Sequence, residues 1–255
     1  MLLRCSSLGQ VATKPRSKSE KYSSTMKTYI RSLLIHDKYG KRKSFENKFT
    51  EKGLNNEDFS IHIYNKVFNT DFKKNDQRFE NGIITGEPDM FNEEMVIDIK
   101  SCWSLDTYCN KDGITDAYKW QLYGYMWLLG LKKALLAYVL TNTPQNLISY
   151  EFSREYYKGG LVELSDEDRA NIASELIYSE EHYEFGFDGD IIEINDYFTD
   201  FKKQYFPTSD KQIVDMPIEK RIKIYDLEWD GEEFEFLSSK IDLAIEYMQE
   251  VATTI

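Results

Sequence analysis

The sequence is poor in the residue types that crosslink a chain or bind soft metals. It has three cysteines, three histidines and five prolines among 255 residues. Cys5, Cys102 and Cys109 are too few and too widely spaced for a disulfide framework or a four-cysteine zinc site. A reduced, cytoplasmic compartment is therefore expected.

Long hydrophobic runs are also missing. No apolar run approaches the roughly 20 residues that a transmembrane helix needs. Met1-Leu2-Leu3 is followed by Arg4 and lacks the apolar core of a signal peptide. We expect no membrane partner.

The composition is that of a globular protein, with 41% hydrophobic and 15% aromatic residues. A chain of this length can bury a sizeable core in one large domain or two small ones. No internal repeat, low-complexity tract or linker is visible. We therefore expect a single domain over residues 1–255, with a core at about 25–155 and a C-terminal elaboration at about 156–255.

The net charge of −12 is unevenly distributed. Residues 1–50 hold twelve Lys/Arg and three Asp/Glu, a balance of +9, whereas residues 151–255 hold ten and twenty-seven, a balance of −17. Such a chain can bind nucleic acid on one side only. The alternative is ordinary charge segregation, in which the acidic part keeps the protein soluble.

A hairpin is predicted in the middle of the chain. Its strands are 83–85 and 95–100, and Asn92-Glu93-Glu94 form its turn. Successive side chains of a strand alternate between faces, so Asp98 and Lys100 share one face. With Asp89 at the end of the first strand, this pair can bind a metal and polarise a phosphate. The alternative is a surface salt bridge.

The remaining pattern alternates helices and strands, which indicates a mixed α/β fold. Helices are expected at 26–39, 55–68, 116–130, 165–177 and 236–248, and strands at 134–140, 147–152 and 220–228, with a turn at 230–231.

Three polar side chains on these helices are candidates for the same site. Glu57 lies in the first turn of its helix, where it either complements the helix dipole or faces a metal. Gln121 and Tyr125 are four residues apart and therefore share a helix face.

The ordered set resembles the motif of the PD-(D/E)XK nuclease superfamily: a helix-borne acid after Lys52-Gly53, then Pro-Asp, then acid-x-Lys, then Gln-x-x-x-Tyr. The residues that match are Glu57, Asp89, Asp98, Lys100, Gln121 and Tyr125. The resemblance covers residues 50–140. Its Gln-x-x-x-Tyr part is typical of the RecB-like branch and of the phage λ exonuclease or YqaJ-type viral recombinase group. It implies a restriction-endonuclease-like core, α/β (α+β), with a central mixed β-sheet flanked by helices and a C-terminal α/β elaboration.

The resemblance also implies chemical roles. Asp89, Asp98, Glu57 and the carbonyl of Ile99 would hold Mg²⁺, with Mn²⁺ able to substitute. Lys100 would orient or deprotonate the attacking water and stabilise the charge of the transition state. Gln121 and Tyr125 would position the substrate or the groups around the metal.

The N-terminal segment has a weaker likeness to the pocket for the DNA end in λ-type exonucleases. Arg4, Ser6 and Ser7 would contact a phosphate there, and Lys14 and Arg16 would add DNA contacts. An ordinary mobile N-terminus is the alternative. Relatives with an iron–sulfur cluster carry four cysteines around the core, a pattern that this chain lacks, so no cluster is expected.

The expected function is a metal-dependent DNA exonuclease, of the phage type that resects linear duplex DNA 5′→3′ for recombination. A restriction- or nicking-type endonuclease and a catalytically inactive module that binds DNA ends are the alternatives. The resemblance suggests a single-strand annealing protein as partner, a trimeric assembly and the cytoplasm of a bacterial host. The acidic residues 179–200 would dock that partner or form solvated surface.

Overall fold

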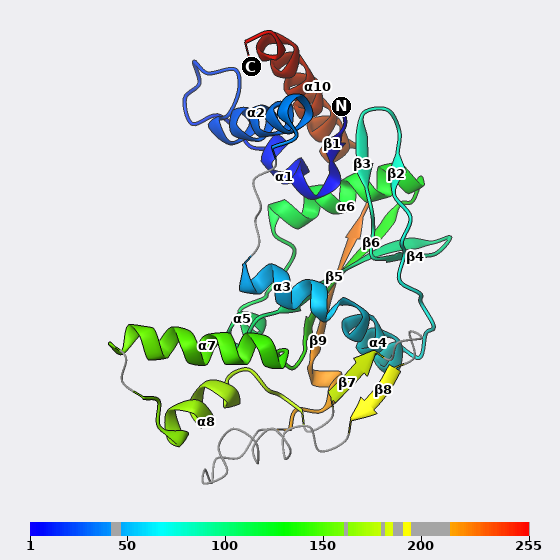
Figure 1. Ribbon diagram of the computed structural model, residues 1–255. Coiled ribbons are helices and arrows are strands. Elements are labelled where there is room, and N and C mark those ends of the chain that lie inside the picture. Colours follow the sequence, from blue (N-terminus) through cyan, green and yellow to red (C-terminus); the bar gives the residue numbers. More distant parts are fainter. Residues whose placement is uncertain (42–46, 161–162, 180–181, 186–190, 195–214, 255) are drawn as a thin grey trace.

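The computed structural model describes residues 1–41, 47–160, 163–179, 182–185, 191–194 and 215–254 (Figure 1). In chain order the elements are β1 (Leu3–Arg4), η1 (Cys5–Ser7), α1 (Leu8–Val11), α2 (Ser24–Tyr39), α3 (Lys48–Asn55), α4 (Glu57–Phe68), β2 (Phe79–Glu80), β3 (Ile84–Gly86), β4 (Met90–Phe91), β5 (Met95–Cys102), α5 (Leu105–Cys109), α6 (Asp116–Leu129), β6 (Lys133–Leu140), α7 (Gln145–Lys158), α8 (Asp166–Ser174), β7 (His182–Phe185), β8 (Ile191–Ile194), η2 (Ile218–Lys220), β9 (Ile222–Glu228) and α10 (Gly231–Ala252).

A mixed four-stranded sheet in the order β4-β5-β6-β9 forms the centre of the protein. Strands β5 and β6 are parallel, and α6 connects them, while β4 and β9 pair antiparallel with their neighbours. The expected central mixed sheet is therefore confirmed. Strand β9 belongs to the expected C-terminal elaboration, yet it pairs along most of β6, so this part of the chain completes the central sheet.

The strand alternation separates two cores on opposite faces of the sheet. Val96 belongs to the core shared with α2, α6 and α10. Ile97 and Ile99 belong to the core shared with α4. Because side chains two residues apart share a face, Asp98 and Lys100 point toward the α6 side with Val96. The predicted alternation of β5 is thus confirmed.

The predicted hairpin is only partly right. Strand β3 pairs with β1 and β2 in a separate three-stranded sheet, and the antiparallel partner of β5 is β4. Pro88, which has no N–H to donate to a ladder, lies between β3 and β4. The turn is where it was expected, since Asn92 Oδ1 accepts hydrogen bonds from the backbone N–H groups of Glu94 and Met95.

Several predicted elements are confirmed and others are wrong. Helices α2 and α6 end where Gly40 and Gly130 adopt a left-handed conformation, with φ of 63° and 69°. The strand expected at 147–152 is part of helix α7. Leu147, Ile148 and Glu151 are its buried residues, so its buried stripe has helical spacing.

Three further differences concern helices. Helix α3 was not expected. Asp230 caps α10 by accepting hydrogen bonds from the N–H groups of Glu232 and Glu233, so the helix begins within the expected turn. Helix α8 ends at Ser174, earlier than expected.

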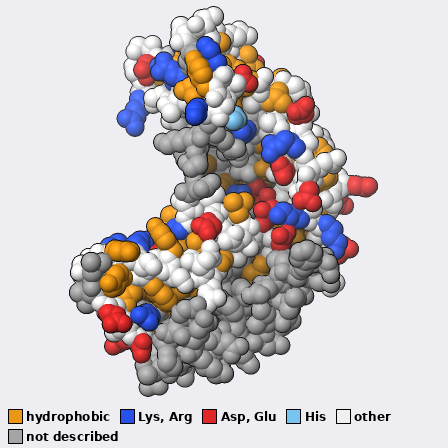
Figure 2. Space-filling view, viewed as in Figure 1, with side chains coloured by type: hydrophobic (Ala, Val, Ile, Leu, Met, Phe, Trp, Pro, Cys, Tyr) orange, Lys and Arg blue, Asp and Glu red, His pale blue; other side chains and the backbone are white. Residues whose placement is uncertain are grey.

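The outer shape is hollowed on one side. In Figure 2 the hollow lies between the end that carries α2 and α10 and the end that carries α7 and α8. No helix among the described residues is long and apolar enough to cross a membrane.

The corner between α3 and α4 is fixed to the ends of the two parallel strands. Lys52, 1% exposed, donates to the carbonyls of Trp103 and Thr141 and to Thr143 Oγ1, each at 2.9 Å. Asn56 has the N-cap position of α4 but makes no side-chain cap. Its amide donates instead to Thr141 Oγ1 at 2.8 Å. These bonds fix the position of the first turn of α4, and therefore the position of Glu57.

We predict that Lys52→Met lowers the free energy of unfolding. In the variant three buried acceptor oxygens lose their donor. The variant no longer has to desolvate an ammonium group, but this gain offsets only part of the loss, so the net cost is about 2 kcal/mol. Urea unfolding measures it. Lys18→Met, at an exposed position, is the matched control and should stay within about 0.5 kcal/mol of the parent protein. Equal stability of the two variants would contradict this role for Lys52.

Candidate active site

Asp98 and Lys100 form a buried ion pair on β5. Lys100 Nζ lies 2.6 Å from Asp98 Oδ2, and the side chains are 25% and 0% exposed. A surface salt bridge is therefore the wrong interpretation of this pair, because the carboxylate has no contact with bulk water.

Burial and neighbouring charges set the protonation of this pair. Burial raises the pKa of Asp98 to about 7, Asp89 and Glu57 add to the rise, and Lys100 opposes it. For Lys100, burial alone would lower the pKa, but the charges of Asp98 and then Asp89 raise it above its ordinary value. Lys100 is thus a cation at neutral pH, and the pKa of Asp98 lies well above that of an ordinary aspartate.

Helix α6 brings Gln121 and Tyr125 to the same centre, as predicted. Gln121 Nε2 donates to Asp98 Oδ1 at 3.0 Å and to the hydroxyl of Tyr125 at 3.0 Å. The Tyr125 hydroxyl donates to the carbonyl of Glu87 at 3.1 Å. The helix therefore orients the Asp98 carboxylate and connects it to the segment that precedes Asp89.

Asp89 continues the ladder between β4 and β5 with its side chain. The last backbone pair of that ladder is Met90 with Ile97. One step further, the backbone N–H of Ile99 donates to Asp89 Oδ2 at 2.6 Å. The half-buried Asp89 carboxylate is thereby held next to the residue that follows Asp98.

Glu57 lies in the first turn of α4, as predicted. Burial raises the pKa of its carboxyl, and the charge of Asp89 adds to the rise, so the two acids are electrostatic neighbours. Lys74 Nζ lies 3.6 Å from Glu57 Oε1 and 3.6 Å from Asp58 Oδ1. Each acid of the centre is therefore accompanied by a donor or a lysine.

Two residues of the segment 69–78 were missed in the sequence. Lys74 partners Glu57, and Asn75 holds the Pro-Asp segment: its backbone N–H donates to the carbonyl of Asp89 and its Nδ2 to that of Pro88, both at 2.8 Å. No local pattern marks this segment, because it approaches the site only after the chain folds back from α4.

Tyr118 was also missed. Its ring centroid lies 5.4 Å from Lys100 Nζ, so it contacts the catalytic candidate from the side of α6. A signal existed in the sequence, since residues 118, 121 and 125 have the i, i+3, i+7 spacing of one helix face.

The donor atoms suit a hard cation, but the carboxylates are already compensated. Mg²⁺ prefers carboxylate and carbonyl oxygens, which Asp89, Asp98, Glu57 and Ile99 offer. In the part of the chain that the structure describes, no three His, Cys, Asp or Glu side chains are arranged to hold a metal together. The ion pairs of Lys100 and Lys74 supply the positive charge in this arrangement.

The N-terminal candidates Arg4, Ser6 and Ser7 lie in β1 and η1; β1 pairs with β3, and η1 packs against α6. Cys5, between them, lies so close to Gly86 and Gly124 that a Cβ there would come within 2.7 Å and 2.8 Å of its sulfur. Only glycine permits this approach. The segment that carries Arg4, Ser6 and Ser7 thus packs directly against α6.

Lys14 and Arg16 are not brought to the carboxylates. They line another cavity, of about 800 Å³, with Asp116, Asp230 and Glu233. The amino ends of α2, α6 and α10 meet there, so both cations face an acidic wall and not the carboxylate centre.

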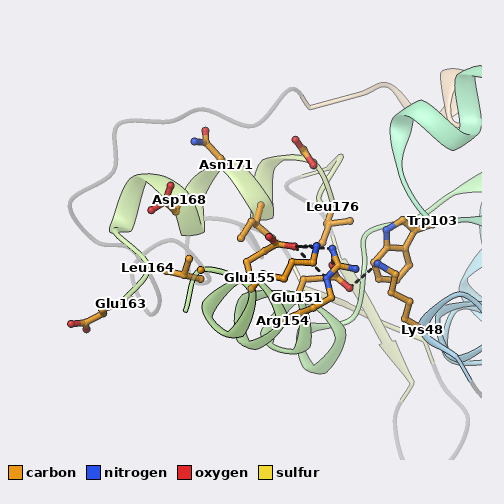
Figure 3. A pocket seen from close by; sticks show the side chains of 14 residues that line it. Lys48, Trp103, Glu151, Arg154, Glu155, Glu163, Leu164, Asp168, Asn171 and Leu176 are labelled. Carbon is orange, nitrogen blue, oxygen red and sulfur yellow. Dashed lines mark hydrogen bonds and ion pairs between the residues drawn. The ribbon is translucent and has the colours of Figure 1, made fainter. Parts of the chain in front are cut away.

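A second cavity, of about 670 Å³, lies between α7 and α8 (Figure 3). Glu151, buried there, pairs with Lys48 and Arg154 at 2.8 Å each. Lys48 and Arg154 are thus already paired with an acid of the same cavity.

No family model matches the sequence, and no curated protein is significantly similar to it. Solved structures do match. A phage-related exonuclease from Haemophilus somnus 129PT is 24% identical with a TM-score of 0.69, over 100% of this chain and 96% of that chain. The alkaline exonuclease LHK-Exo from Laribacter hongkongensis is 9% identical with a TM-score of 0.58, over 99% of this chain and 90% of that one. LHK-Exo in complex with dAMP is 10% identical with a TM-score of 0.57.

These likenesses extend over almost the whole of each chain. They confirm that the protein has the fold of these exonucleases, the restriction-endonuclease-like fold that its motif predicted.

We predict that Gln121→Ala raises the pKa of Asp98 further. The amide donates to the carboxylate, and a donor to the charged form favours that form. NMR titration of the aspartate carboxyl carbons measures the change. Tyr125→Phe keeps this donor and removes only the neighbouring hydroxyl, so it is the control. An unchanged Asp98 titration in Gln121→Ala would show that the hydrogen bond does not tune the acid.

Proposed function

We propose that the chain is a metal-dependent deoxyribonuclease, an exonuclease that hydrolyses linear duplex DNA from its 5′ ends in the manner of phage recombination. The observation that carries the proposal is the buried Asp98–Lys100 pair beside Asp89 and under Gln121, within a fold shared with exonucleases. Clustered charges of this kind are costly to bury, which supports a catalytic use for them.

Mg²⁺ is the proposed cofactor, with Mn²⁺ as a substitute. Asp89, Asp98 and the carbonyl of Ile99 would hold it, and Glu57 would complete its surroundings. When bound, it would polarise the scissile phosphate and offset the charge of the leaving oxygen. The charge of Asp89 raises the pKa of both Asp98 and Glu57, which places the three carboxylates close enough to support a shared cation.

The residues of the chain itself have separable tasks in this proposal. Lys100, a cation because of its acidic neighbours, would stabilise the added charge on the phosphate and orient the attacking water. Gln121 would hold the Asp98 carboxylate in place. Tyr125 would hold the backbone of Glu87 through its hydrogen bond to the Glu87 carbonyl, and would thereby fix the segment that leads to Asp89.

The proposed substrate is DNA with a free end. The dAMP bound to LHK-Exo supports a nucleotide ligand for this fold. Arg4, Ser6 and Ser7, beside the glycine-lined approach of η1 to α6, would bind the end phosphate. The protein would act as a trimer, together with a single-strand annealing protein, in the cytoplasm of a bacterial host.

We predict that Lys100→Met lowers DNA hydrolysis about a thousandfold and Asp89→Asn about a hundredfold, because each removes stabilisation of the phosphate or its cation. Release of label from end-labelled linear duplex with Mg²⁺ measures this and reports polarity. Lys158→Ala, remote on α7, should stay within about twofold of wild type. Thermal melting establishes that the variants are folded.

Closed circular duplex distinguishes the proposed exonuclease from an endonuclease of the same fold. An enzyme that needs an end leaves it intact, whereas an endonuclease linearises it. Full activity of folded Lys100→Met and Asp89→Asn would show that the assigned centre is wrong. Tight binding of DNA ends without cleavage in Mg²⁺ or Mn²⁺ would indicate a binding module.

We predict that hydrolysis at subsaturating Mg²⁺ rises with pH through about 7. Burial raises the pKa of Asp98 to about 7, so below that pH the acid is protonated and cannot hold a cation. The value of kcat/KM should fall about tenfold per pH unit below this point and level off above it. Raising the Mg²⁺ concentration should move the step to lower pH. A flat profile across neutrality, in protein that melts normally, would contradict this role for Asp98.

A further inference from the structure

A groove adjoins the carboxylate centre on the side of α4. It runs between the segment 69–75 and the β4–β5 turn, with a volume of about 700 Å³. Phe72, Lys73 and Lys74 line one side, and Phe91 and Asn92 line the other. Phe72 and Phe91 are half-buried, and both lysines are exposed.

The groove has the chemistry that nucleic-acid strands require. Lysines bind phosphates, and aromatic rings accept bases without regard to sequence. Asp71 is the acid among its lining residues, against Lys73 and Lys74. The two other cavities described above carry more acids than bases in their walls. In a chain of net charge −12, a lysine-lined groove beside the proposed centre is therefore a distinctive feature.

The same segment joins the groove to the centre. Asn75 holds the backbone of Pro88 and Asp89 through two hydrogen bonds of 2.8 Å. Lys74 Nζ lies 3.6 Å from Glu57 Oε1, and the Lys74 side chain is 35% exposed. The groove and the carboxylate centre thus have the segment 69–75 in common.

The segment is held in this conformation by its own hydrogen bonds. Asn65 on α4 donates to the carbonyl of Phe72 at 2.8 Å and accepts from the N–H of Phe72 at 2.9 Å and from Thr70 Oγ1 at 2.8 Å. Asn75 Oδ1 accepts from the N–H of Gln77 at 3.0 Å. A preformed groove loses less conformational entropy on binding than a mobile loop would.

We propose that this groove binds the DNA strand next to the scissile phosphate, with Lys73 and Lys74 on phosphates and Phe91 and Phe72 against a base or sugar. The inference rests on the proposed nuclease function and adds to it a subsite with named contacts. Lys74 links the two, since a phosphate can compete for it with the carboxylates of Glu57 and Asp58.

The salt dependence of DNA binding tests the phosphate contacts. Fluorescence anisotropy of a labelled linear duplex, in EDTA so that no cleavage occurs, gives Kd over a series of salt concentrations. The double variant Lys73→Ala/Lys74→Ala should weaken binding about tenfold at low salt and reduce the slope of log Kd against log salt by about 1 to 2, because each phosphate contact contributes about 0.9.

Lys27→Ala on α2 is the matched control. Its side chain is 34% exposed, against 35% for Lys74, and it has a comparable ion pair, at 3.9 Å to Glu20. Its slope should equal that of wild type. If the double variant keeps the wild-type slope, or if Lys27→Ala loses as much, the groove is not a phosphate subsite.

Phe91→Leu tests the ring contact separately. It should weaken binding about fivefold with an unchanged salt slope, since stacking involves no counterion release. Phe68→Leu, at a 43% exposed position outside the groove lining, should bind like wild type. Equal affinity of the two variants, with normal melting, would overturn the ring contact. Wild-type protein that neither binds nor cleaves DNA would instead refute the proposed function.

Discussion

The structure depends on the burial of one carboxylate. Asp98 lies in the middle of a parallel strand pair with no exposure, where an unpaired charge would cost several kcal/mol. Two contacts make it tolerable: the ion pair with Lys100 from the same strand and the amide of Gln121 from the crossover helix. The position of α6 over the sheet is therefore coupled to the charge of Asp98. A shift of that helix would break the hydrogen bond from Gln121.

The features that could be predicted from the sequence are those determined by short spacings. Alternation along β5 places Asp98 and Lys100 together, and the interval of four residues places Tyr125 beside Gln121. Tyr118 obeys the same helical rule and could have been found by it. The remaining misses depend on contacts between distant segments. Lys52 lies 89 residues from Thr141, to which it donates, and Asn75 meets Pro88 only because a loop returns from the far end of α4.

Short apolar runs misled in two places. Residues 147–152 and 83–85 both have the composition of strands, but composition does not specify a partner. The first run faces α8, and its buried residues follow a helical stripe. The second is a strand, but its neighbours are β1 and β2, since the chain changes direction at Pro88 before β4 forms. In each case the wrong prediction concerned the element that packs against or pairs with the apolar segment. That partner is determined by the whole fold.

The lysines beside the acids give the site a definite electrostatic state. Lys100 and Lys74 each neutralise a carboxylate that a divalent cation would otherwise attract. In the proposed function, a cation bound to Asp98 and Glu57 would release Lys100 and Lys74 from these ion pairs, beside the path proposed for the DNA. Screening in salt limits the reach of exposed charges to about 8 to 10 Å. An acidic protein can bind DNA under this condition, provided that its few cations are concentrated where the strand passes.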